Sequence, residues 1–129
     1  MSYQEFKELR VWQEAKQLAI RIYKITANTQ FSKDFGLRDQ VRKAAVSVAS
    51  NIAEGYEKNS NKDFVRYLLI AKGSLAELRT QLEIALEIGY IDKKVFEKAE
   101  DQCKKITAMV IKLIKARRQD NLNLRKQAD

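Results

Sequence analysis

The fold is decided by two segments rich in small residues, FGLRDQVRKAAVSVASNIAEG at residues 35–55 and GSLAELRTQLEIALEIGY at residues 73–90. Apolar residues of the first recur every three or four positions and therefore share one face of a helix: Leu37, Val41, Ala44, Val48 and Ile52. The alanines and serines between them allow a neighbouring helix to approach closely. The second segment continues a stripe that starts at Phe64 and alternates steps of four and three. Two long helices packed against each other are expected.

Similar stripes on either side of these segments predict four helices in all. We expect the first over about residues 4–27, the second over 33–57, the third between Ser60 and Gly89, and the fourth from Asp92 to about Arg118. The expected N-caps are Ser32 or Asp34, then Ser60 and Asp92, and Gly89 is placed to end the third helix in a left-handed conformation.

Short joints between helices of similar length are typical of an antiparallel bundle. The sequence therefore predicts an all-α fold, a single-domain up-down-up-down four-helix bundle over residues 1–118. Residues 119–129 are expected to form a polar C-terminal tail outside it.

Composition excludes several classes of protein. The 129 residues contain no histidine and no proline, and Cys103 is the single cysteine. Histidine-based triads and Glu-x-x-His metal sites are therefore impossible, and so is a disulfide framework. We expect no cofactor and no metal. With no leader segment and no run of 18 apolar residues, the sequence favours a cytoplasmic protein that does not span a membrane.

Three stretches resemble a known family: LRVWQEA at residues 9–15, residues 35–55, and residues 64–90. Their most specific pieces are SNIAEG at 50–55 and GSLAEL at 73–78. They are similar to the bacterial four-helix-bundle proteins named for 23S rRNA intervening sequences, over roughly residues 5–117 of this chain. Members often carry a proline where this chain has Ala49, so the helix kink that a proline would cause is in question here.

The resemblance implies an antiparallel bundle that assembles as a ring-like homopentamer, and it implies no defined reaction. A weaker resemblance, in shape and charge, links the chain to the accessory proteins of diversity-generating retroelements. Those proteins are basic pentameric bundles that bind nucleic acid and a reverse transcriptase, so a reverse transcriptase is a candidate partner by analogy.

The basic excess is concentrated at the C-terminal end. Residues 90–129 carry 11 Lys/Arg against 6 Asp/Glu, a net of +5 within the chain's +8, and residues 104–118 hold six basic residues and no acidic one. On a helical wheel the lysines lie opposite the apolar stripe. The predicted nucleic-acid-binding residues are Lys94, Lys104, Lys105, Lys112, Lys115 and Arg118. The alternative is a solvated helix face whose lysines complement the helix dipole.

A second candidate group is polar. Ser47, Asn51 and Glu54 share a face of the second predicted helix, and Ser74, Glu77 and Gln81 share a face of the third. We expect an interhelical hydrogen-bond network if these faces meet. A Glu54–Glu77 pair could instead act as acid and base, which is the enzyme alternative. We favour the structural role and expect no catalytic residue.

Several apolar residues lie away from the main stripes and exceed what a monomeric bundle can bury, which predicts self-association: Ile20, Tyr67, Ile70, Ile84, Leu86, Ile88, Ile111 and Ile114. The sequence therefore indicates a non-enzymatic, homo-oligomeric accessory or scaffold protein that binds nucleic acid, with RNA favoured over DNA because of the family resemblance. The alternative is a protein-interaction scaffold that does not itself bind nucleic acid.

Overall fold

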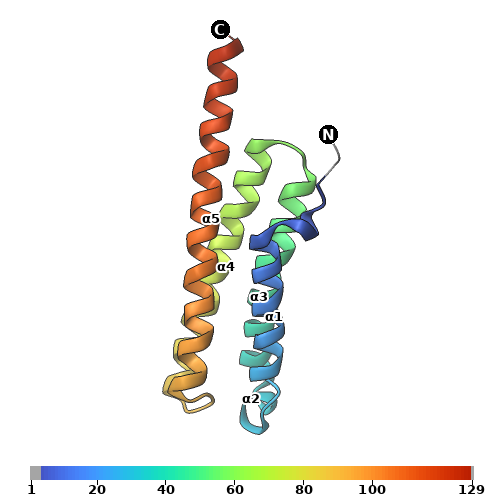
Figure 1. Ribbon diagram of the computed structural model, residues 1–129. Helices are drawn as coiled ribbons and strands as arrows, with labels where there is room; N and C mark the ends of the chain where they lie inside the picture. Colours follow the sequence, from blue (N-terminus) through green and yellow to red (C-terminus); the bar gives the residue numbers. More distant parts are fainter. Residues whose placement is uncertain (1–3, 129) are drawn as a thin grey trace.

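The regular elements in the computed structural model, which describes residues 4–128, are all helices. A short 3₁₀ helix η1 (Phe6–Glu8) is followed by α1 (Arg10–Ile25), α2 (Thr29–Lys33), α3 (Phe35–Glu57), α4 (Asn61–Glu87) and α5 (Lys93–Ala128). The four long helices run antiparallel to their chain neighbours (Figure 1). In cross-section, α1 contacts α3, α3 contacts α4, α4 contacts α5, and α5 returns to α1. This confirms the predicted all-α bundle.

The helix ends follow the predicted capping residues. Asp34 accepts a hydrogen bond from the N–H of Leu37 at the start of α3, and Ser60 accepts one from the N–H of Asp63 at the start of α4. After α4 the chain turns at Gly89, whose φ of 83° lies in the left-handed region that glycine adopts without steric cost. Asp92 then accepts from the N–H of Val95 in the first turn of α5.

One contiguous core fills the space between the four long helices, and it contains the stripes expected from the sequence. Fully buried members from each long helix include Leu18, Ile22, Val41, Ile52, Leu68, Leu75, Leu82, Ala99, Cys103 and Ile106. Ile114, which was expected on the surface, belongs to this core at 5% exposure, because α5 turns it towards the other helices. Leu86 is also partly buried against the core.

The contact between α3 and α4 is close at Gly55 and open at Gly73, the small residue that begins the second fold-deciding segment. A Cβ atom added at Gly55 would lie 2.5 Å from the Cβ of Tyr67, whereas one added at Gly73 would meet nothing within 4 Å. Gly73 faces outward because it lies off the stripe that Phe64 begins. Ala44 and Ala45 are buried as expected.

Three boundaries differ from the sequence prediction. The first long helix begins at Arg10 rather than near residue 4, and Asn28 caps the additional short helix α2 by accepting from the N–H of Phe31. The fourth long helix does not fade near Arg118 but continues to Ala128. Its last turns project beyond the other helices (Figure 1). The segment lacks proline and glycine, so nothing stops the helix where its apolar stripe ends.

Candidate nucleic-acid interface

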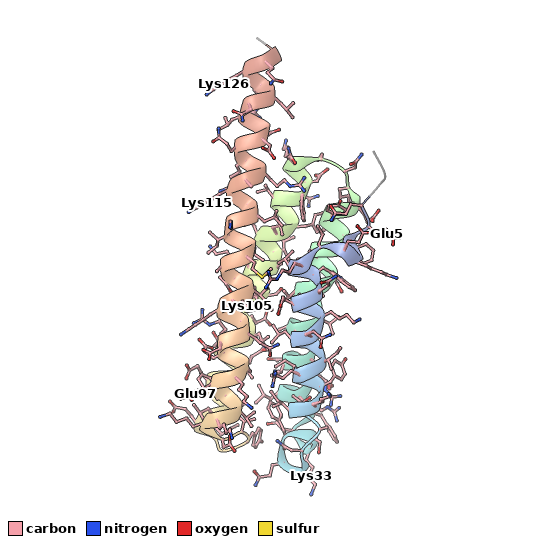
Figure 2. All side chains as sticks on the ribbon, in the orientation of Figure 1. Glu5, Lys33, Glu97, Lys105, Lys115 and Lys126 are labelled. Carbon is pink, nitrogen blue, oxygen red and sulfur yellow. The ribbon has the colours of Figure 1, made fainter. Side chains whose placement is uncertain are left out.

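All six predicted binding residues lie on α5 and are exposed: Lys94, Lys104, Lys105, Lys112, Lys115 and Arg118. The five lysines form two rows, because intervals of 7 and 11 residues return to nearly the same side of a helix. Lys94, Lys105 and Lys112 make one row, and Lys104 and Lys115 belong to the other. Lys115 points away from the neighbouring helices, as does Lys126 in the projecting end of α5 (Figure 2).

Lys105 differs from the other lysines of the set because it reaches α1. Its ammonium donates to a carboxylate oxygen of Glu14 at 3.0 Å, and its side chain remains half exposed. Part of its charge is thus compensated within the protein, although an exposed pair of this kind is weak and salt-sensitive. The basic surface therefore borders the seam between α1 and α5.

We call the line along which α1 packs against α5 the α1/α5 seam. Two hollows open along it. One, of about 570 Å³, is lined by the basic residues Arg10, Lys105 and Lys112 together with Met109 and Leu113. The other, of about 630 Å³, lies nearer the turn between α4 and α5. Its basic lining residues are Arg21, Lys24 and Lys98. The seam therefore adds cations from α1 to the α5 rows.

Two polar contacts cross the seam. One is the Lys105–Glu14 pair, and the other runs from Arg21 Nε to Gln102 Oε1. The α1 cations were missed by sequence reasoning because residues 1–30 carry little net charge, with 5 Lys/Arg against 3 Asp/Glu. Only the packing of α1 beside α5 brings Arg10, Arg21 and Lys24 to the basic face.

The predicted polar network forms in part. The hydroxyls of Ser47 on α3 and Ser74 on α4 lie 2.9 Å apart, and Asn51 Nδ2 donates to both the hydroxyl and the carbonyl oxygen of Ser47. The Ser47–Ser74 contact therefore links the two helices, and Asn51 holds Ser47 from within α3. Gln81, buried at 6% exposure, donates to Glu77 within α4, and this contact does not cross to α3.

Glu54 and Glu77 do not form the pair that the enzyme alternative requires. Ser47 and Ser74 lie at the same height along the antiparallel pair of helices α3 and α4. Glu54 is seven residues from Ser47 towards one end of the pair, and Glu77 is three residues from Ser74 towards the other end. At 1.5 Å per residue the two carboxylates are about 15 Å apart along the axis. Both are exposed, and Glu54 accepts instead from the hydroxyl of Tyr67.

A partly buried charged contact between α4 and α5 was not predicted. Arg79 Nε donates to Glu100 Oε1 at 2.8 Å, and this hydrogen bond raises the pKa of the Arg79 guanidinium. The second oxygen, Glu100 Oε2, is buried without a hydrogen-bond partner among the described residues. Nearby Cys103 is fully buried, and desolvation raises the pKa of its thiol to about 12. Its burial confirms Cys103 as a core residue.

Within residues 4–128, no three His, Cys, Asp or Glu side chains gather in a way that could hold a metal ion. In the same part of the chain, no helix combines the length and apolar character needed to cross a membrane.

Comparison with known proteins agrees with this picture of the fold. A protein of unknown function from the S23 ribosomal protein family of Bacteroides thetaiotaomicron VPI-5482 has a similar solved structure, with a TM-score of 0.75 and 29% sequence identity. The alignment covers 81% of this chain and 98% of that one. No curated protein matches the sequence.

The family model described as 23S rRNA-intervening sequence protein matches residues 7–112, which span α1, α3, α4 and more than half of α5. That range includes SNIAEG and GSLAEL, the two segments on which the resemblance was based. The chain therefore belongs to the 23S rRNA-intervening sequence protein family.

Proposed function

We propose that the protein is a non-enzymatic, homo-oligomeric scaffold that binds nucleic acid through the basic face of α5. The observation that carries this proposal is the run of six basic residues between Lys104 and Arg118, which no acidic residue interrupts. Five of them are exposed, and the sixth, Arg117, is partly buried with its guanidinium over the ring of Phe64.

The placement of these cations suits a phosphate backbone. Lys104 and Lys115 are separated by about 16 Å along the helix, so a single rod-like surface can meet several successive phosphates. The α1/α5 seam adds Arg10, Arg21 and Lys24 alongside. Neutralising phosphates releases condensed counterions, which makes such binding salt-dependent and weakly sequence-specific. RNA is favoured over DNA on the family's association with rRNA alone.

The second candidate function is a protein-interaction scaffold without direct nucleic-acid binding. One feature favours it. Met109 and Leu113 line the 570 Å³ hollow of the seam together with Arg10 and Lys112. An acidic amphipathic helix would therefore find both charge and apolar contact there. A reverse transcriptase is a candidate partner through the resemblance in shape to retroelement accessory proteins. The identity of neighbouring genes would test that partner. A cytoplasmic location is part of the same proposal.

The deciding experiment titrates labelled single- and double-stranded RNA and DNA at about 50 mM salt and upward. Replacing Lys104, Lys105, Lys112 and Lys115 with Gln should weaken binding to all sequences and reduce the slope of log affinity against log salt. The matched control replaces four exposed lysines of α3, α4 and their joint, which removes the same charge from other faces: Lys43, Lys58, Lys62 and Lys72.

A smaller effect of the control set than of the α5 set supports the proposal. Equal effects would assign binding to net charge and not to this face. No complex at about 50 mM salt would favour the protein-interaction scaffold, which a binding assay with acidic helical peptides would then examine.

A further inference from the structure

An apolar groove lies on the outside of the bundle between α1 and α3, away from the core. It has a volume of about 650 Å³, and we call it the α1/α3 groove. Its lining is mostly apolar or aromatic: Phe6, Trp12, Ala19, Ile20, Tyr23, Val46, Ala49 and Ala53. Tyr23 and Val46 are 46% and 41% exposed, so this surface is open to solvent in the monomer. Lys16 and Lys24 also line it and make its edge basic.

Exposed isoleucines also lie along α4, which does not line that groove. Ile70, Glu77 and Ile84 follow one another at intervals of seven residues, and Ile88 lies one turn further on. We call these four residues the α4 stripe. The three isoleucines are 45%, 47% and 53% exposed. The core stripe of α4 is a separate set that starts at Phe64. The α4 stripe is therefore a second, solvent-exposed line of residues on this helix, in which the carboxylate of Glu77 lies between Ile70 and Ile84.

At the Ile84–Ile88 end the α4 stripe has an acidic border, whereas the groove has a basic one. Glu83 and Glu87 surround Ile84 and Ile88 around a shallow hollow of about 340 Å³. A heptad stripe on one helix also has the shape that fits between two others, as in helix-in-groove recognition. The two surfaces therefore complement each other in charge and in form, and the isoleucines of the stripe supply apolar contact for the groove.

We propose that the α4 stripe of one copy of this chain docks in the α1/α3 groove of the next copy. The inference rests on the self-association included in the proposed function and names the surfaces that carry it. Because groove and stripe are different parts of the molecule, the contact is heterologous, and repeating it gives a closed ring or an open filament. The α5 lysines lie outside both surfaces, so assembly would repeat the basic face once in every copy.

The test uses two variants, each of which places a carboxylate in one of the two surfaces. Val46→Glu alters the groove, and Ile84→Glu alters the α4 stripe. Both positions are exposed in the monomer, so the fold should survive, and circular dichroism would verify it. Each variant alone should be monomeric at micromolar concentration in mass photometry, with self-affinity lowered about a hundredfold or more. Leu124→Glu, at an exposed apolar site on the projecting end of α5, is the control and should assemble normally.

Mixing the two variants gives the sharper result. Each still has one intact surface, so Val46→Glu and Ile84→Glu together should form a one-to-one dimer that grows no further. An interface that pairs the same patch on both copies would give no such complementation. The inference would be overturned if either variant assembled like the wild type, or if the two variants stayed monomeric when mixed. Either result would leave self-association itself intact. A wild-type protein that is monomeric at micromolar concentration would overturn both.

Discussion

The backbone of Gly55 lies directly against the side chain of Tyr67, so closely that a Cβ atom at Gly55 would come within 2.5 Å of the Cβ of Tyr67. Gly55 is buried near the end of α3, and Tyr67 is in the second turn of α4. The approach occurs at the end of SNIAEG, one of the two segments that are most specific to the family. This gives that glycine a packing role.

Substituting two glycines with alanine should therefore change stability in opposite directions. Gly55→Ala should destabilise the fold by about 1–3 kcal/mol, because the methyl group overlaps the Cβ of Tyr67 and forces the helices apart. Gly73→Ala should stabilise it by about 0.5–1 kcal/mol, since the site is open and alanine is the better helix former. Urea unfolding followed by circular dichroism measures both. The same sign for the two substitutions would contradict the assigned packing.

A larger side chain at Ala45 should have a similar cost. Ala45 is fully buried on α3, so Ala45→Leu should overpack the core and destabilise the fold by about 1–3 kcal/mol. Ala76→Leu introduces the same side chain at an exposed position of α4 and should change stability little. Thermal midpoints of the two variants make the comparison. An unchanged midpoint for Ala45→Leu would mean that this face of α3 is open.

Much of the fold could be predicted because the signals are local. Asp34, Ser60, Gly89 and Asp92 mark helix ends through their own backbone or side-chain chemistry, which does not depend on distant residues. The core stripes follow from helical periodicity in the same way. Periodicity was misleading at the end of α5. Hydrophobic periodicity predicts burial and not helix formation, so the predicted helix ended near Arg118. The polar residues beyond Arg118 are nevertheless helical to Ala128.

The candidate site was less predictable because it depends on which helices are neighbours. The lysines of α5 were recognised by their spacing, but Arg10, Arg21 and Lys24 join them only through the packing of α1 beside α5. The sequence placed Glu54 and Glu77 on faces that could meet. Their separation along the bundle axis depends on the register between α3 and α4, which the Ser47–Ser74 contact shows. Register between helices leaves no local signal in the sequence.

Burial of Cys103 predicts both slow thiol chemistry and a loss of stability at high pH. Desolvation raises the thiol pKa from 9.0 to about 12, so the native state holds this proton more tightly than the unfolded chain does. The resulting stabilisation is complete below pH 9.0 and is lost as the pH rises towards 12. Native protein should react slowly with a thiol reagent near neutral pH. The stability difference from Cys103→Ala, measured by urea unfolding, should shrink between pH 8 and pH 11. A constant difference would contradict a buried thiol with this pKa.

Removing the carboxylate of Glu14 should strengthen nucleic-acid binding. Glu14 holds the Lys105 ammonium at 3.0 Å, and an exposed pair of this kind contributes roughly 0.2–1 kcal/mol. Glu14→Gln therefore has little effect on the fold but releases Lys105 for a phosphate and removes a repulsive charge from the α1/α5 seam. Affinity for RNA at low salt should rise about two- to fivefold, in line with the energy of such a pair.

The control for Glu14→Gln is Asp39→Asn on α3, which likewise removes the acid from an ion pair, that of Arg38 with Asp39 at 3.0 Å. It makes the same change in net charge on a helix that does not line the seam. A gain for Glu14→Gln that exceeds the gain for Asp39→Asn would assign the phosphate contact to the seam beside α5. Equal gains would show that only net charge matters, and a loss of affinity with Glu14→Gln would mean that the Lys105–Glu14 pair shapes the binding surface instead of competing with it.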